Sequence, residues 1–196
     1  MKTNTKLTVD EFIEEYSKLS DGRRYELQDG EVLVSPEPGP YHGRIQALLL
    51  AFLLEYSDEH AEATIYGPTN VALSTNACRG PDITVTVQGD GAVEHKTKLT
   101  GKPAVLIEIV SPSNPSYDLV DKRKAYCNER VPEIWFFDTT SKEALFLTLD
   151  KGVYSEHRVS DGIFASKALT GLRIDVAALF ELDRKRLMKL VRKWRK

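Results

Sequence analysis

Residues 103–122 read PAVLIEIVSPSNPSYDLVDK, and the first half of this stretch is a run of aliphatic, largely β-branched side chains. Such a run predicts a strand over residues 104–110 that is buried on both faces. Glu108 lies within it, where an ionised and unpaired carboxylate costs several kcal/mol. We therefore expect Glu108 to be protonated, paired with a cation or bound to a metal ion.

The strand and the turn after it predict which way Glu108 points and where Lys122 lies. Because side chains alternate along a strand, Glu108 shares its face with the other even-numbered residues of the run. The prolines of the SPSNPS turn end the strand, and Asn114 or Ser116 would cap a helix over about residues 115–128. That helix carries Lys122 back towards the end of the strand.

The rest of the chain predicts a mixture of helices and strands. Helical periodicity is present in residues 8–19, 41–56, 175–182 and 183–196. Strands are expected at residues 24–27, 31–35, 63–66, 70–73, 82–87, 133–138, 144–149 and 153–159. Thr8 and Glu11 have the spacing of a capping box, Asp29-Gly30 predicts a tight hairpin, and residues 88–102 are expected to form a loop.

Length and composition favour a single domain over residues 1–196. The chain has 196 residues, 41% of them hydrophobic, so it can bury one sizeable core. Cys78 and Cys127 are too few for a disulfide framework, and the lack of a signal peptide predicts a cytoplasmic protein. The longest apolar run, residues 47–54, is far shorter than the ~20 residues of a membrane span.

Charge is distributed unevenly along the chain. Residues 183–196 contain eight basic residues and Asp183, a net charge of +7; since the whole chain carries −2, the remainder carries −9. As a helix, this basic tail has one apolar stripe, formed by Leu187, Leu190, Val191 and Trp194. The tail either complements the acidic body or supplies contacts to nucleic-acid phosphates.

Three side chains form the candidate site. Asp82 begins one strand directly after Pro81, Glu108 lies in a neighbouring strand, and Lys122 lies on the helix that follows. Two carboxylates from adjacent strands offer hard oxygen ligands, which suit Mg²⁺ or Mn²⁺, and a nearby lysine can hold an attacking water or a phosphate oxygen. This set fits phosphodiester hydrolysis.

Each of these residues also has a structural interpretation. Pro-Asp at the head of a strand is common turn chemistry. Asp118 lies four residues before Lys122 on the same helix, where an exposed ion pair contributes only ~0.3–0.5 kcal/mol. Glu108 needs a buried partner under either interpretation.

A succession of short motifs runs along the chain: YELQDG, Ser-Pro, a histidine that opens the long helix, PDITV, LIEIVSPSN, YDLVDK and VPEIWFFD. Over about residues 25–154 this order resembles the Uma-type family of restriction endonucleases, which belongs to the PD-(D/E)XK nuclease superfamily. The resemblance implies an α/β, restriction-endonuclease-like fold with a mixed central sheet flanked by helices. It also implies a magnesium-dependent nuclease site that acts on DNA.

Carried over by this resemblance, Asp82 is the aspartate of the PD motif and Glu108 is the acidic residue of the (D/E)XK motif. Both would bind the metal ion, together with a backbone carbonyl near Ile109. The chain departs from the superfamily pattern because Val110, not lysine, stands two residues after Glu108. Lys122 of YDLVDK would replace that lysine from the next helix.

Two further residues are candidates to support the site. Glu26 of the YEL motif would add a metal or water contact, or else would form a cross-strand ion pair with Arg23 or Arg24. His42, at the start of the long helix, would contact phosphate or transfer a proton, although a lone histidine is more often structural.

The leading hypothesis is a metal-dependent endonuclease that acts on DNA with Mg²⁺ or Mn²⁺. One alternative is a nucleic-acid-binding or interaction protein that keeps the nuclease fold without turnover, which the acidic body favours. Another is a hydrolase of a different phosphoester. Residues 41–56 carry more apolar surface than one helix face can bury, and the superfamily often acts as dimers, so a homodimer or larger even assembly is expected.

Overall fold

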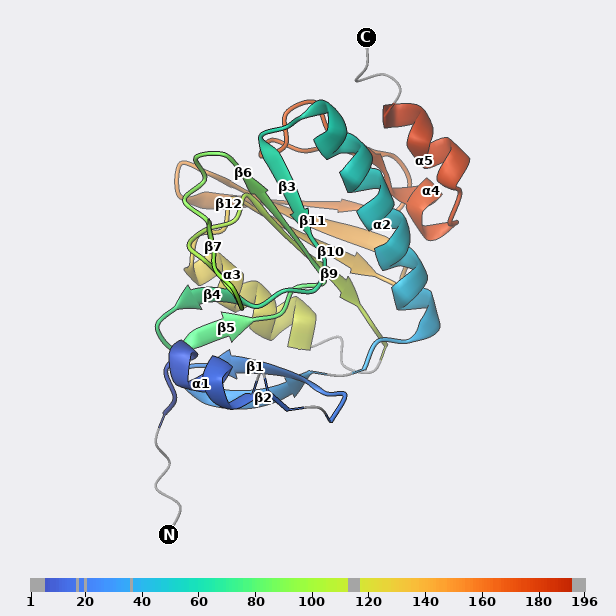
Figure 1. Cartoon of the computed structure of the whole chain (residues 1–196). Helices are drawn as coiled ribbons and strands as arrows, with labels where there is room; N and C mark the ends of the chain where they lie inside the picture. Colours follow the sequence, from blue (N-terminus) through green and yellow to red (C-terminus); the bar gives the residue numbers. More distant parts are fainter. Residues whose placement is uncertain (1–5, 17, 20, 36, 113–116, 192–196) are drawn as a thin grey trace.

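The computed structural model describes residues 6–16, 18–19, 21–35, 37–112 and 117–191, which form a layered α/β arrangement (Figure 1). The first mixed sheet has the strand order β12 (Val153–Val159), β11 (Glu143–Asp150), β10 (Glu133–Asp138), β9 (Val105–Val110), β6 (Ile83–Val87) and β3 (Ala63–Tyr66). The second has the order β2 (Glu31–Ser35), β1 (Arg24–Gln28), β5 (Ala77–Arg79), β4 (Val71–Ser74), β8 (Leu99–Thr100) and β7 (Val93–Glu94).

The remaining elements cover these sheets. The helices are α1 (Val9–Tyr16), α2 (Pro40–Glu59), the π-helix η1 (Tyr117–Lys122), α3 (Arg123–Asn128), α4 (Val176–Phe180) and α5 (Arg184–Val191), and β13 (Ile163–Ala165) pairs with β14 (Arg173–Asp175). In Figure 1, α2, α4 and α5 lie on one side of the first sheet, and α3 and the second sheet lie on the other. None of the described helices is long and apolar enough to cross a membrane.

The predicted central strand is β9, and all six of its residues are buried. It lies between β10, to which it is parallel, and β6, to which it is antiparallel. Val105, Ile107 and Ile109 belong to the apolar cluster under α2, whereas Leu106 and Val110 belong to the cluster under α3. Glu108 therefore points to the α3 side, between the two sheets.

Local signals in the N-terminal region are confirmed. The Thr8 backbone N–H donates to Glu11 Oε2 at 2.8 Å, and the Glu11 backbone N–H donates to Thr8 Oγ1 at 3.4 Å, which completes the capping box. Asp29 and Gly30 both have positive φ, 51° and 80°, as the two central residues of a type I′ turn require. The apolar face of α1 buries Val9, Phe12 and Ile13 against the second sheet.

The structure differs from the expected elements at four places. The helix expected at residues 115–128 is a π-helical segment, η1, followed by α3, and its candidate caps Asn114 and Ser116 lie outside the described residues. The expected loop at residues 88–102 contains the two-residue strands β7 and β8. The three-residue strand β5 and the pair of three-residue strands β13 and β14 were not expected. Strands this short have no measurable periodicity, because two or three residues do not complete an alternation.

Two helices near the C-terminus cover α2. Leu48, Leu49, Phe52 and Leu53 of α2 are buried in a cluster that includes side chains of α4 and α5, and Leu54 remains 51% exposed. Most of the apolar surface on which the homodimer expectation rested is therefore covered within the chain. The homodimer itself stays a prediction.

The described part of the basic tail docks on the body. Leu187, Leu190 and Val191 of α5 are buried, as the apolar stripe predicts. On the polar side, Arg186 contacts Asp175 and Glu181, at 2.8 and 3.4 Å. These ion pairs favour the interpretation that the tail complements the acidic body; Trp194 lies outside the described residues.

Asp175→Ala is expected to lower the free energy of unfolding by about 1–2 kcal/mol. Asp175 is the N-cap of α4 and accepts a hydrogen bond from the Ala178 backbone N–H at 3.0 Å. Urea unfolding of Asp175→Ala and Asp175→Asn would check this, because asparagine keeps the cap and loses only the charge opposite Arg186. An asparagine variant as unstable as the alanine variant would assign the effect to the ion pair instead.

Candidate active site

Glu26 contacts Lys122, and the other four predicted site residues, His42, Asp82, Glu108 and Lys122, line one small cavity of about 40 Å³. Its walls include side chains from both sheets, α2 and η1: Arg24, His42, Asp82, Glu108, Asp118 and Lys122. A single water needs at least ~10–15 Å³ of such volume. The cavity therefore has room for a small ion and a few waters, and a larger group can enter only in part.

Glu108 is paired with a cation, one of the outcomes expected for a buried carboxylate. Lys122 Nζ donates to Glu108 Oε2 at 2.9 Å, and the hydroxyl of Tyr126 in α3 donates to Oε1 at 2.5 Å. Burial raises the pKa of Glu108 well above its usual value; the charge of Lys122 opposes this shift, and Asp82, Asp118 and Glu26 add to it. Negative charge is thus concentrated around Glu108.

Lys122 is a buried residue that three carboxylates share. Besides Glu108, its Nζ lies 3.2 Å from Glu26 Oε1 and 3.4 Å from Asp118 Oδ1, and its side chain is only 7% exposed. Burial alone would lower the pKa of Lys122, but the three carboxylates hold it well above the usual value. The ion pair between Asp118 and Lys122 that the sequence suggested is present, but it is buried rather than exposed, and it is one of three carboxylate contacts of Lys122.

The π-helix η1 positions Lys122. In an α-helix each turn takes 3.6 residues, and a π-helical turn is wider and is often found at functional sites. Here it carries Tyr117, Asp118 and Lys122 towards the cavity, and the Tyr117 hydroxyl donates to Glu26 Oε2 at 2.6 Å. The side chains of η1 therefore connect the second sheet to β9.

Asp82 lies directly before β6 and is held by three donors. The Ile109 backbone N–H donates to Asp82 Oδ2 at 2.8 Å, and His42 Nε2 and Arg24 Nη1 lie 3.1 and 3.5 Å from Oδ1. His42 Nδ1 lies 3.1 Å from Ser111 Oγ. His42 is therefore fixed between Asp82 and the residue that follows β9.

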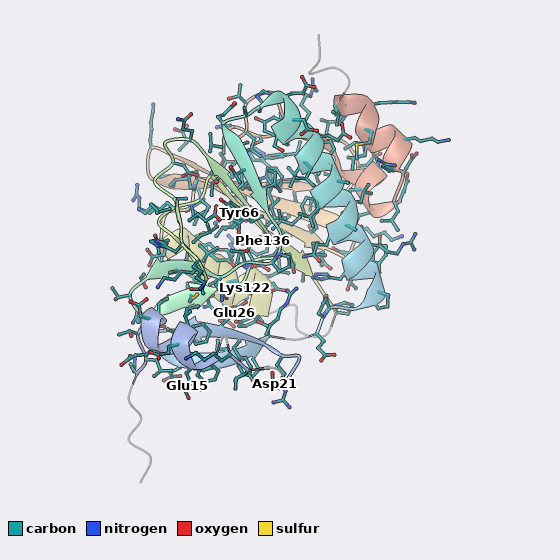
Figure 2. The ribbon with its side chains drawn as sticks, in the orientation of Figure 1. Glu15, Asp21, Glu26, Tyr66, Lys122 and Phe136 are labelled. Carbon is teal, nitrogen blue, oxygen red and sulfur yellow. The ribbon has the colours of Figure 1, made fainter. Side chains whose placement is uncertain are left out.

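Glu26 is a buried link between the two sheets, and Figure 2 shows it close to Lys122. The Arg79 guanidinium donates to Glu26 Oε2 at 3.2 Å. Burial raises the pKa of Glu26, but Lys122, Tyr117 and Arg79 outweigh it, so the net pKa is lowered. Glu26 pairs with Arg79 and Lys122. The alternative of a cross-strand ion pair with Arg23 or Arg24 is therefore wrong, and Arg24 contacts Asp82 instead.

Four residues of this network were not expected from the sequence as parts of the site: Arg79, Tyr117, Asp118 and Tyr126. Arg79 is fully buried and contacts Glu26, Gln28 and Tyr117. A possible signal was its position, because Arg79-Gly80 directly precedes the Pro81-Asp82 motif. The tyrosines offered none, since tyrosine on an amphipathic segment is usually core.

The carboxylates fit a divalent cation of the magnesium type. Among the described residues, no group of three or more His, Cys, Asp or Glu side chains is arranged to hold a metal ion. Mg²⁺, however, keeps several waters and is commonly held by one or two carboxylates together with substrate phosphate. Asp82 and Glu108 supply two such carboxylates at one cavity, and the pKa of Glu108 is raised mainly by burial and further by the nearby carboxylates, an effect that a bound cation would oppose.

Comparisons with known proteins identify the family and the fold of the chain. The chain has the fold of a crystal structure described as a "putative nuclease" of DUF820 from Anabaena variabilis, with a TM-score of 0.72 and 16% identity over 89% of this chain and 98% of the other. No curated protein matches the chain. The Uma2 family, described as "Putative restriction endonuclease", matches residues 12–177. The chain therefore belongs to this family of restriction-endonuclease-like proteins.

Proposed function

We propose that this member of the Uma2 family is a metal-dependent endonuclease that hydrolyses phosphodiester bonds in DNA. The observation that carries the proposal is the meeting of Asp82, Glu108 and Lys122 at one small cavity. They come from the start of β6, the interior of β9 and η1, in a chain whose family and fold are those of nucleases.

Asp82 and Glu108 would hold Mg²⁺ or Mn²⁺ in this mechanism. Bound there, such an ion would polarise the phosphate and lower the pKa of a water ligand. The Ile109 backbone N–H keeps Asp82 in place by donating to Oδ2, which leaves Oδ1 facing His42 and Arg24. The carboxylate is thus oriented before any ligand arrives, which lowers the cost of binding.

Lys122 would stabilise the negative charge that develops on the phosphate or orient the attacking water. Its charge is secure at neutral pH, because three carboxylates hold the pKa of its ammonium group high. Glu26 would act mainly as a positioning residue, since it lies 3.2 Å from Lys122 Nζ and is itself held by Arg79. His42 would contact a phosphate oxygen or transfer a proton, since it lines the same cavity as Asp82 and Lys122.

Mg²⁺ or Mn²⁺ is expected to raise the melting temperature of the protein and to support cleavage of plasmid, linear or single-stranded DNA, and EDTA should abolish both effects. An ion that binds only the folded state adds ~2.7 kcal/mol of stability at a concentration of 100 Kd, which is about 5–10 °C for a chain of this size. Thermal melts and gel assays with each metal would check this. Absence of any metal-dependent shift or cleavage would contradict the proposal.

A second candidate function is supported by a specific observation. Lys122 and Tyr126 already occupy both carboxylate oxygens of Glu108, so the site is internally satisfied without a metal ion. This arrangement suits a protein that binds nucleic acid or another partner and keeps the nuclease fold without turnover. DNA binding that persists in EDTA, with no cleavage under any metal, would favour this candidate.

Three broader expectations remain predictions within this proposal. The whole chain would form one domain, the protein would act as a homodimer or larger even assembly, and it would work in the cytoplasm. Light scattering at micromolar concentration would test the assembly. A monomer throughout that range would contradict it.

A further inference from the structure

A second, larger cavity lies beside the candidate active site. Its volume is about 250 Å³, and it shares Arg24 and Gly80 with the cavity around Asp82. Its walls come from α1, β1 and the loop between β3 and β4. None of the roles assigned above to Asp82, Glu108 or Lys122 uses this space.

Aromatic rings form one wall of this cavity. Phe12 and Tyr16 of α1 stack with ring centroids 5.4 Å apart, and Tyr16 meets Tyr25 of β1 with centroids 5.1 Å apart. Phe12 is buried beneath the others, whereas Tyr16 and Tyr25 are half-buried. The Tyr25 hydroxyl donates to Asp21 Oδ2 at 2.5 Å, which fixes the ring at the rim of the cavity.

Polar groups complete the cavity on the side of the active site. The Arg24 guanidinium stands at the junction of the two cavities, 3.5 Å from Asp82, and its side chain is 40% exposed. Glu26 also lines the larger cavity, and Thr69 and Asn70 line its loop wall. Arg24 thus places a cation between an aromatic cavity and the candidate metal site. This arrangement suits a phosphate whose neighbouring group carries a flat aromatic ring, because the cation can bind the phosphate while the ring enters the cavity.

The size of the cavity restricts what it can take. Pockets for drug-sized ligands measure ~300–1,000 Å³, so about 250 Å³ suits one ring system with its sugar and excludes a stacked base pair. A base can reach such a cavity only from single-stranded DNA or after it leaves the duplex, and enzymes that act on bases use both routes.

We propose that this cavity binds one unpaired nucleobase of the DNA substrate, from the nucleotide next to the phosphate at Asp82 and Glu108. The base stacks against Tyr16 and Tyr25, and Arg24 contacts the phosphate between the two cavities. This inference rests on the proposed nuclease function and narrows its substrate to single-stranded or locally unpaired DNA.

The test measures binding in EDTA, so that it does not depend on cleavage. Fluorescence anisotropy compares a labelled single strand, an abasic strand of equal length and the matching duplex. The single strand is expected to bind about 5- to 150-fold more tightly than the abasic strand, the equivalent of ~1–3 kcal/mol for one stacked base. Equal affinity for the base-containing and abasic strands would overturn the proposal, and so would tighter binding of the duplex.

Two variants locate the preference in this cavity. Tyr16→Leu keeps an apolar side chain but removes the aromatic face, and Thr69→Trp fills the cavity from the opposite wall. Both are expected to lose most of the preference for the base-containing strand. Tyr66→Leu is the matched control, because Tyr66 is also half-buried but lies outside the cavity and pairs with Glu94.

The outcomes separate this inference from the proposed function. Thermal melts identify any variant that fails to fold. If Tyr16→Leu does not fold, Thr69→Trp alone tests the cavity. If both folded variants retain the full base preference, the cavity is not the binding site even where metal-dependent cleavage is observed. A base preference that Tyr16→Leu and Thr69→Trp remove supports the cavity even where no cleavage is found.

Discussion

Lys122→Met is expected to lower the free energy of unfolding by about 3–5 kcal/mol, the usual cost of removing one partner from a buried ion pair. The substitution keeps much of the side-chain volume but leaves Glu26, Glu108 and Asp118 without their shared cation. Cleavage should be lost as well, because no other ammonium group lies among the described residues that line the cavity. Urea unfolding with a plasmid cleavage assay measures both effects.

Controls distinguish the network from a general effect of losing a lysine. Lys124→Met removes an exposed lysine two residues away and should change stability by less than about 0.5 kcal/mol. The double variant Lys122→Met with Glu108→Gln should recover part of the loss, because it removes one of the stranded charges. A cost for Lys122→Met no larger than that of Lys124→Met would mean that the buried network contributes nothing to folding.

Asp82→Asn is expected to reduce metal-dependent cleavage by about a thousandfold and to remove the metal-dependent rise in melting temperature. The asparagine oxygen can still accept from the Ile109 backbone N–H, so the local fold is retained. The variant loses a charged ligand to an ion whose charge stabilisation is worth several kcal/mol, and each 1.36 kcal/mol is about tenfold in rate.

Asp121→Asn is the matched control for this substitution, because Asp121 is an exposed aspartate on η1 next to Lys122. It should leave both cleavage and the metal response unchanged. If Asp82→Asn keeps the full melting shift with Mg²⁺, then Asp82 has been wrongly assigned as a ligand.

The sequence was sufficient to predict the central strand and the direction of Glu108. The aliphatic run around Glu108 predicted a strand buried on both faces, and the alternation of side chains predicted which residues share a face with Glu108. The strand expected at residues 82–87 also followed from its alternation, and β6 begins one residue later, at Ile83, so that Asp82 directly precedes it. These are local patterns, and tertiary contacts did not override them.

The partners of these carboxylates could not be predicted from the sequence. Arg79 lies on a strand of three residues, and Leu27 and Cys78 are the register partners that bring it beside Glu26. The π-helical turn at Lys122 left no periodic signal, because six residues fit an α-helical pattern equally well. Long-range pairing, rather than propensity, decided which arginine Glu26 contacts.

The way the candidate site is assembled determines at what stage of folding its side chains come together. Its contacts join residues 14, 27 and 91 positions apart, from Lys122 to Glu108, Ile109 to Asp82 and Tyr117 to Glu26. Contacts over such separations form late, after the cost of closing long loops has been met. A ribosome-bound or partly folded chain would therefore hold Asp82, Glu108 and Lys122 apart, and under the proposed function cleavage would begin only with the complete fold.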